Sequence, residues 1–217
     1  MTAAPMGLRE RKKLATRQLI AETARRLFAE RGFDGVTVAE IARAVEVSEK
    51  TVFNYFPTKE DLVYWQLEAF ESQILGAIAE REPGESALEA FRRFVLQQRG
   101  LIVEKDPAAR EELLRLTRVI AESPALLERE QQIFRRFTAS LAAQLARETG
   151  ASPDDVEPRV AADAMMGVHR ALVDFARRRI LEGGRPPGLA REVREQGERA
   201  LALLDDGLRG YAVRPAS

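Results

Sequence analysis

The 217-residue sequence contains no cysteine, and its single histidine is His169. Without cysteine the chain can form neither a disulfide nor a thiolate metal site, and it has no thiol nucleophile. It also lacks a glycine-rich phosphate loop and a cluster of metal-ligating residues. The carboxylates of Asp154, Asp155 and Glu157 stand in a proline-containing turn that is typical of a helix N-terminus. We therefore expect no enzymatic activity, no metal and no cofactor.

Long apolar runs are missing as well, although 45% of the residues are hydrophobic, which is ample for a packed core. No run approaches the roughly 20 apolar residues that a bilayer-spanning helix needs. The N-terminus also lacks the apolar core of a signal peptide. The sequence thus predicts a cytoplasmic protein with no membrane partner.

Neither sign of charge is in excess, because 34 basic side chains balance 34 acidic ones. A net charge of zero argues against attraction of the whole molecule to nucleic acid. The distribution is uneven, however: up to residue 31 there are eight basic and only three acidic side chains. Four of the five lysines, Lys12, Lys13, Lys50 and Lys59, lie within the first 59 residues. We expect these cations to contact phosphates; the alternative is an ordinary solvated helix face.

Apolar residues recur at helical spacing along most of the chain. Val63, Leu67, Phe70, Ile74 and Ile78, for example, form one continuous stripe. No convincing alternating strand pattern is present. The sequence predicts an all-α fold of about nine helices: three in an N-terminal domain, a fourth linking it to the rest, and five in a C-terminal bundle. The expected domains are residues 1–57 and residues 58–217.

Residues 38–56 contain two short helical segments joined by a tight turn. Thr37 is the predicted N-cap of the first helix and Ser48 that of the second, since short hydroxyl side chains accept hydrogen bonds from free N–H groups there. Pro57 is predicted to end the second helix after Phe56. Two short helices in this arrangement are typical of a helix-turn-helix that reads DNA.

Several segments around this motif carry a more specific pattern: Arg17, Arg-Arg-Leu-Phe-Ala-Glu-Arg-Gly-Phe (25–33), Val-Thr-Val (36–38), Ile-Ala (41–42) and Thr-Val-Phe-Asn-Tyr-Phe-Pro-Thr-Lys-Glu-Asp-Leu (51–62). With them the first quarter of the chain resembles the tetracycline-repressor-like (TetR) transcriptional regulators. Beyond residue 65 the resemblance rests on length and helical pattern. One position departs from it, since Glu46 stands where the turn of the family usually has glycine. A left-handed conformation at Glu46 would cost about 1 kcal/mol.

The resemblance implies which side chains meet DNA. The candidate DNA-binding residues are Thr37, Ser48, Glu49, Lys50, Thr51, Phe53, Asn54, Tyr55 and Lys59. In the family, the positions of residues 49, 50, 51 and 53 read bases, while those of Thr37, Tyr55 and Lys59 hold the backbone. Lys50 could reach guanine, Thr51 and Phe53 could meet thymine methyl groups, and Asn54 could pair with adenine or donate to a phosphate.

Three further expectations concern the same domain. Val52 and Phe56 are expected in the core rather than at the DNA. Tyr55 is expected either to pack or to direct its hydroxyl at a phosphate. The stretch of residues 8–13 resembles a basic extension that some relatives lay along DNA, or is a frayed end.

In the family the C-terminal helices form a dimer and enclose a ligand cavity. The last two long helices, expected over residues 156–181 and 189–211, would form the homodimer interface; an intramolecular core is the alternative. The candidate ligand-binding residues are Trp65, Phe70, Phe91, Phe94, Phe134, Phe137, Met165, Met166 and His169. Such a lining would suit a small, largely apolar effector, although each residue could instead belong to the core. His169 could face the pocket, the dimer interface or the core.

The leading hypothesis is a ligand-responsive transcriptional repressor that binds a partly palindromic operator in double-stranded DNA as a dimer. A second hypothesis retains DNA binding without small-molecule control, making the protein constitutive, protein-regulated or activating. Ligand-dependent stabilisation would separate these two. An enzyme is the remote alternative.

Overall fold

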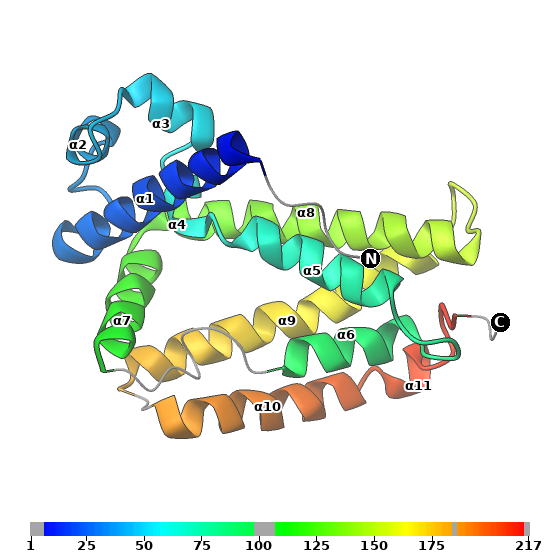
Figure 1. Ribbon diagram of the computed structural model, residues 1–217. Coiled ribbons are helices and arrows are strands. Elements are labelled where there is room, and N and C mark those ends of the chain that lie inside the picture. Colours follow the sequence, from blue (N-terminus) through cyan, green and yellow to red (C-terminus); the bar gives the residue numbers. More distant parts are fainter. Residues whose placement is uncertain (1–6, 98–106, 184–185, 215–217) are drawn as a thin grey trace. The chain divides into compact units, whose positions relative to one another are not determined.

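The computed structural model describes residues 7–97, 107–183 and 186–214, and in these ranges the chain is all-α, as predicted (Figure 1). The helices are α1 (Leu8–Arg31), α2 (Val38–Ala44), α3 (Glu49–Tyr55), α4 (Asp61–Tyr64), α5 (Leu67–Ala79), α6 (Ala87–Leu96), α7 (Pro107–Glu122), α8 (Pro124–Thr149), α9 (Glu157–Leu181), α10 (Pro186–Ala202) and α11 (Asp205–Leu208). None of these helices is long and apolar enough to cross a membrane.

The described residues therefore form eleven helices rather than about nine. The expected linking helix is broken at Trp65 and Gln66 into α4 and α5, and the last helix is broken before Asp205 into α10 and α11. The apolar stripe continues through both breaks, so the spacing of the apolar residues does not mark them.

The first of two compact units, called the head unit here, comprises residues up to Gln66 together with Arg118–Arg129. It contains α1 to α4, the end of α7 and the start of α8. Its core includes the fully buried side chains of Phe28, Ile41, Val52 and Phe56. The boundary expected at residue 58 falls inside this unit, and the assignment of DNA binding to residues 1–57 stays a prediction.

Side-chain caps begin the short helices of the head unit, as the sequence predicts. The Thr37 hydroxyl accepts from the Glu40 N–H at 3.2 Å, and the Glu40 carboxylate accepts from the Thr37 N–H at 2.8 Å. At α3, Ser48 Oγ accepts from the Thr51 N–H at 3.1 Å. Such caps satisfy N–H groups that have no partner inside the helix.

Two contacts join α4 to residues 118–129 within the head unit. The Tyr64 hydroxyl donates to the Leu126 carbonyl oxygen at 3.0 Å. Asp61 Oδ1 accepts from Arg129 Nε and Nη2 at 2.9 and 2.7 Å, while Asp61 Oδ2 accepts from the Thr58 N–H at 3.0 Å. One carboxylate at the start of α4 thus contacts both the preceding turn and a residue of α8.

The second compact unit, called the body unit here, comprises Leu67–Thr117 and Glu130–Ser217. In it α10 packs against both α9 and α6, and α5 packs against α6. The helices approach closely at Gly197 of α10, where an added Cβ would lie 2.6 Å from Leu96 Cδ2 and 3.2 Å from Leu172 Cδ1.

Arg81 links Ala212, near the end of the described chain, to the segment between α5 and α6. Its buried guanidinium donates to three backbone carbonyl oxygens, those of Ile78, Glu85 and Ala212, and forms an ion pair with Glu148 at 2.6 Å. An isolated β-bridge between Ser86 and Val213 lies beside this cluster. A buried charge is tolerated only with such partners.

Gly35, in the turn between α1 and α2, provides a test of the close packing in the head unit. An added Cβ would lie 2.4 Å from the Arg31 carbonyl oxygen, so the backbone itself would have to move. We expect Gly35→Ala to lower the free energy of unfolding by about 1–3 kcal/mol in urea titrations.

The matched control is Gly76→Ala in α5, where an added Cβ meets nothing within 4 Å. This change should stabilise the protein by up to about 1 kcal/mol, because alanine favours a helix. Equal unfolding midpoints for Gly35→Ala and the wild type would contradict the close approach at Gly35.

Candidate functional site

Helix α3 presents a polar and aromatic surface to solvent. Glu49, Lys50, Phe53 and Asn54 are exposed, and 45% of Phe53 is accessible although phenylalanine is usually buried. Thr51 and Tyr55 are half-buried. The expectation that Val52 and Phe56 belong to the core is confirmed, since each is 1% exposed. These anchors fix one face of α3 and leave the other free.

The cap of α3 occupies two of the candidate DNA-binding hydroxyl groups. Ser48 Oγ and Thr51 Oγ1 lie 2.8 Å apart and share a hydrogen bond, in addition to the one from the Thr51 N–H. The carbon atoms of Thr51 are therefore the part of its side chain that is left for a contact.

The turn between α2 and α3 contains Glu46 with φ of 55°, which is the left-handed conformation considered from the sequence. The Val47 N–H donates to the Ala42 carbonyl oxygen at 2.9 Å and closes the turn. The chain thus adopts a glycine-like turn without glycine, at an expected cost of about 1 kcal/mol.

Thr37 and Glu40 form a reciprocal cap to which Arg31 adds a charge. The hydrogen bond from the Thr37 N–H, followed by those from Arg31 and the Thr37 hydroxyl, lowers the pKa of Glu40 to about 2. Arg31 Nη2 lies 2.8 Å from the Glu40 carboxylate. Since the Thr37 hydroxyl donates to Glu40 at 2.9 Å, a phosphate would have to compete for that proton.

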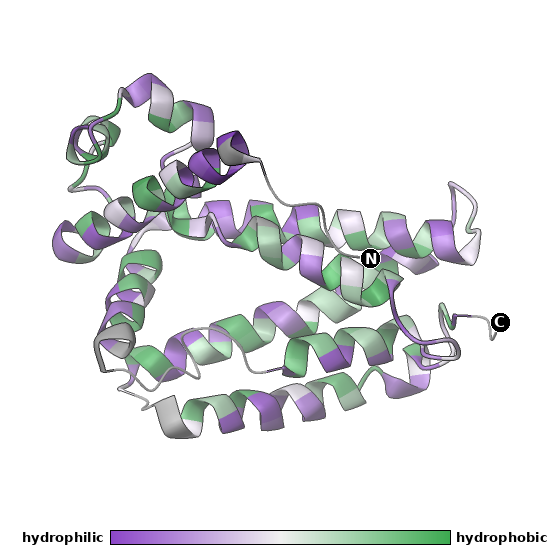
Figure 2. Cartoon of the chain, in the orientation of Figure 1, coloured by the Kyte–Doolittle hydropathy of each residue, from purple (hydrophilic) through white to green (hydrophobic). Residues whose placement is uncertain are grey.

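The exposed cations of the head unit gather at the start of α1. Arg9, Arg11, Lys12 and Lys13 are all exposed, and this stretch is helical from Leu8 onward. Figure 2 shows the first turns of α1 as predominantly hydrophilic. Lys59, by contrast, is half-buried and donates to the Phe33 carbonyl oxygen at 2.7 Å.

In the body unit, five of the candidate ligand-binding residues form one aromatic cluster. The ring centroids of Phe70 and His169 lie 4.8 Å apart in a stacked arrangement, and those of Phe134 and His169 lie 5.6 Å apart edge to face. Phe94 and Phe137 contact Phe70 at 5.4 and 6.2 Å. Helices α5, α6, α8 and α9 contribute these rings.

His169 is neutral in this environment. The loss of hydration among the rings, followed by the positive charge of Arg170, lowers the pKa of His169 to about 4. A neutral imidazole retains one donor and one acceptor nitrogen.

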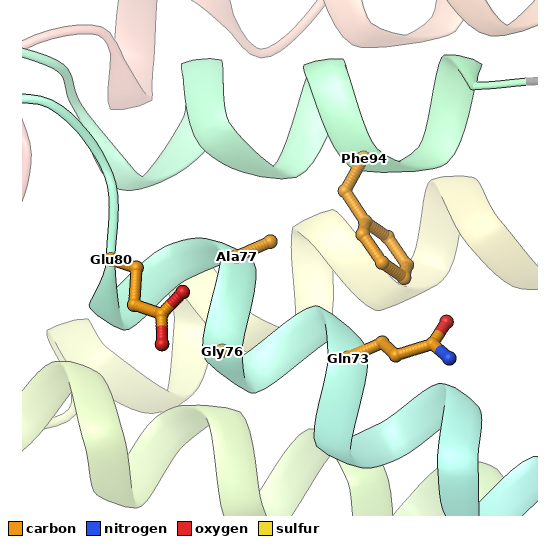
Figure 3. A pocket seen from close by; sticks show the side chains of 5 residues that line it. All are labelled: Gln73, Gly76, Ala77, Glu80 and Phe94. Carbon is orange, nitrogen blue, oxygen red and sulfur yellow. The ribbon is translucent and has the colours of Figure 1, made fainter. Parts of the chain in front are cut away.

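An open pocket of about 630 Å³ lies between α5 and α6, lined by Gln73, Gly76, Ala77, Glu80 and Phe94. Figure 3 shows Phe94 pointing from α6 toward α5. Phe94 is the one candidate ligand-binding residue in this lining. The other four could not be recognised from the sequence, because small and polar residues on an amphipathic helix are also typical of its solvent-exposed face.

The remaining candidate ligand-binding residues lie elsewhere. Phe91, Met165 and Met166 are at most 1% exposed and pack in the core of the body unit. Trp65 belongs to the head unit, where its buried indole Nε1 has no hydrogen-bond partner among the described residues.

Comparison with known proteins assigns both parts of the chain. The family described as "Bacterial regulatory proteins, tetR family" matches residues 20–64, and "MftR C-terminal domain" matches residues 85–182. The chain is 31% identical to the HTH-type transcriptional regulator TcmR of Streptomyces glaucescens over 172 residues, which cover 76% of this chain and 75% of TcmR. The chain belongs to the TetR family. It is therefore a DNA-binding transcriptional regulator and not an enzyme.

Other TetR-like matches agree with this assignment. The chain is 50% identical to the HTH-type transcriptional regulator LuxR of Vibrio harveyi over 50 residues, which cover 23% of this chain and 24% of LuxR. Among solved structures, the SmeT–triclosan complex matches 94% of this chain and 96% of its own, with a TM-score of 0.56 and 18% identity.

NalD of Pseudomonas aeruginosa, a secondary repressor of the MexAB-OprM multidrug efflux pump, matches 86% of this chain and 96% of its own, with a TM-score of 0.52 and 21% identity. At these identities both structures show a shared fold. Regulators of the TetR family bind DNA and act as dimers.

The single histidine of this TetR-family protein allows a direct test of the aromatic cluster. Because the pKa of His169 is about 4 in the folded state and 6.5 without the surrounding rings, the unfolded state binds an extra proton between these values. This contribution to stability is complete above pH 6.5, falls as the pH drops toward 4, and levels off below that. His169→Phe should lack this part of the pH dependence.

The measurement is urea unfolding of the wild type and His169→Phe at pH 7, 5.5 and 4, with an NMR titration of the imidazole. The difference between the two proteins cancels the carboxylates that titrate in the same range. An imidazole midpoint near 6.5 in the native protein would mean that the ring is hydrated.

Proposed function

We propose that this chain is a repressor that binds a partly palindromic operator as a homodimer in the cytoplasm and releases it when a small molecule binds the body unit. The observation that carries the DNA-binding part is the exposure of Lys50, Phe53 and Asn54 on a helix anchored from behind by Val52 and Phe56. A recognition helix needs a fixed inner face and a chemically mixed outer face.

The proposed base contacts follow from the polar and apolar atoms that the α3 side chains expose. Lys50 can donate to guanine O6 or N7 in the major groove. Phe53 and the carbon atoms of Thr51 can meet thymine methyl groups, since the Thr51 hydroxyl is already bonded to Ser48. Asn54 has both a donor and an acceptor for adenine. The Tyr55 hydroxyl is proposed for a phosphate.

The proposed dimer uses α9 and α10. Val160 near the start of α9 is 59% exposed, and Leu203 directly after α10 is 84% exposed. Val193, Ala200 and Leu204 are only half-buried, whereas the neighbouring Leu189 and Leu201 are buried. An apolar face that its own chain leaves partly open favours an isologous contact between two copies.

The proposed effector site is the pocket between α5 and α6, which adjoins the aromatic cluster through Phe94. SmeT, which shares the fold, is known in complex with triclosan, an aromatic compound. Phe94 would contact a largely apolar ligand in this pocket, and Gln73 and Glu80 could orient its polar end. A coupling of about 1–3 kcal/mol would lower operator affinity 5- to 150-fold.

The DNA contacts can be tested with duplexes selected from a random pool by the wild-type protein. The selected sites should show two-fold symmetry with half-sites about one helical turn apart. Lys50→Ala and Phe53→Ala should each weaken specific binding by roughly 1–3 kcal/mol per lost base contact. Arg115→Ala, which removes an exposed cation on α7 of the body unit, is the matched control and should bind normally. If both α3 variants select the same sites as the wild type, the proposal that α3 reads the major groove is wrong.

The effector site can be tested with two alanines of α5. Ala77 lines the pocket, whereas Ala79 is exposed and does not. In a thermal-shift screen of aromatic compounds that includes triclosan, an effector at a hundred times its Kd should stabilise the wild type by about 2.7 kcal/mol and release the operator. Ala77→Trp should lose both responses, and Ala79→Trp should keep them. If no compound shifts the wild type, regulation without a small molecule becomes the better hypothesis.

A further inference from the structure

One face of α9 is largely uncovered by the other helices of the body unit. The opposite face, which includes Met165, Leu172 and Ala176, is buried. At Gly167, midway along the open face, an added Cβ would meet, among the described residues, only the end of the Arg170 side chain, at 3.8 Å. The residues of the open face, called the α9 seam here, are Glu157, Val160, Ala164, Ala171, Phe175 and Arg178, all of them exposed or half-buried.

The α9 seam has the seven-residue repeat of a coiled coil. Glu157, Ala164, Ala171 and Arg178 follow one another at intervals of seven. With this repeat, two helices that cross at about 20° keep the same face toward each other along their whole contact. Because alanine is small, the two middle positions allow the helix axes to approach closely. The seam is therefore suited to a second helix of similar length.

The α9 seam is also self-complementary. In a two-fold contact between antiparallel helices, positions equally far from the midpoint of the seam face each other. With the midpoint between positions 167 and 168, Ala164 lies opposite Ala171 of the partner subunit. Val160, which is 59% exposed, lies opposite Phe175 of the partner subunit. Small residues thus meet near the centre, and an aromatic ring meets an exposed valine on either side.

Opposite charges meet at both ends of such a contact, where Glu157 lies opposite Arg178 of the partner subunit. Neither side chain forms an ion pair with a described residue of its own chain. The adjacent Arg177 and Arg179, by contrast, each pair with a carboxylate of their own chain, at 2.6 and 2.8 Å. Two-fold symmetry would supply the intersubunit pair twice in each dimer.

Other arrangements of two α9 seams leave these charges unmatched. In a parallel pair the two copies of Glu157 would meet, and like charges in contact cost free energy. After a shift by one heptad in one direction, Arg178 would lie opposite Ala164 of the partner subunit. After a shift in the other direction, Glu157 would lie opposite Ala171 of the partner subunit. The charged ends therefore favour one register.

We propose that two copies of the chain associate through antiparallel α9 seams with the two-fold axis between positions 167 and 168, and that ion pairs between Glu157 and Arg178 of the partner subunit fix this register. This assignment rests on the proposed homodimer and deepens it, because each position of the seam receives a partner. The apolar centre supplies affinity, and the charged ends supply specificity.

The test uses Glu157→Arg and Arg178→Glu, each of which places like charges at both ends of the contact. The dissociation constant of the dimer, measured by analytical ultracentrifugation with a fluorescent label, should rise about tenfold or more for each variant alone. An equimolar mixture of the two variants should form mixed dimers with nearly the wild-type dissociation constant. In a mixed dimer the reversed charge at position 157 faces the reversed charge at position 178, and the two original charges face each other at the other end.

The matched control is Arg147→Glu, which makes the same charge change at an exposed position of α8 outside the seam. It should keep the wild-type dissociation constant and should not rescue Glu157→Arg. The register is overturned if the wild type is a dimer and either both reversals keep its dissociation constant or their mixture stays as weak as the separate variants. A wild-type protein that stays monomeric would instead reject the proposed homodimer, and this register with it.

Single cysteines give a second readout of the register, because the chain contains no cysteine of its own. A mixture of Ala164→Cys and Ala171→Cys should form a disulfide-linked dimer under mild oxidation, since the two positions face each other closely. Each variant alone should not cross-link, because its two thiols would lie about 10 Å apart along the helices, the rise of seven residues. Cross-linking by either variant alone, or none by the dimeric mixture, would also overturn the register.

Discussion

The proposed DNA-reading surface is built from two seven-residue helices, which would not be stable as helices on their own in water. An isolated helix shorter than about 12–15 residues is marginal even with favourable residues. The surface therefore depends on what is buried behind it. Ile41 fixes α2 and Val52 fixes α3 in the core of the head unit, and Thr37 and Ser48 satisfy the free N–H groups at their starts. The outer face can then vary in sequence without loss of the fold.

Although the net charge is zero, the cations of the body unit and those of the head unit have different surroundings. In the body unit, arginines pair with carboxylates across helices, as in Arg177 with Glu130 at 2.6 Å and Arg179 with Glu192 at 2.8 Å. The first of these pairs is largely buried and the second is partly exposed, and in both the opposite charges cancel each other's field. In the head unit, Arg9, Arg11, Lys12 and Lys13 at the start of α1 and Lys50 on α3 are among the exposed cations that could meet DNA.

The sequence predicted the features that depend on residues close to one another along the chain. The predicted N-caps Thr37 and Ser48 each bond to a backbone N–H three positions along the chain, so both could be recognised from the sequence. The helical class and the buried Val52 followed from apolar spacing, which is also a local property.

The features that the sequence did not predict are those that need distant partners. The carbonyl oxygen that accepts from Lys59 is 26 residues away, and Asp61 and Arg129 are 68 residues apart. The break at Trp65 and the pocket beside Gln73 and Glu80 likewise arise from packing that periodicity does not encode. For the same reason the aromatic candidates divided into a clustered group and a group in the core, although their spacing along the chain was alike.

The hydrogen bonds of Arg81 determine which substitutions around it the protein can tolerate. Three of its four acceptors are backbone carbonyl oxygens, which every residue type provides. A substitution at Ile78, Glu85 or Ala212 would therefore keep the backbone acceptor, whereas lysine in place of Arg81 would lose hydrogen bonds because its compact charge lacks the planar fork. The side chains that this interaction requires are therefore those of Arg81 and Glu148. Ala212 contributes only its backbone carbonyl oxygen, so a different residue there could still bind Arg81.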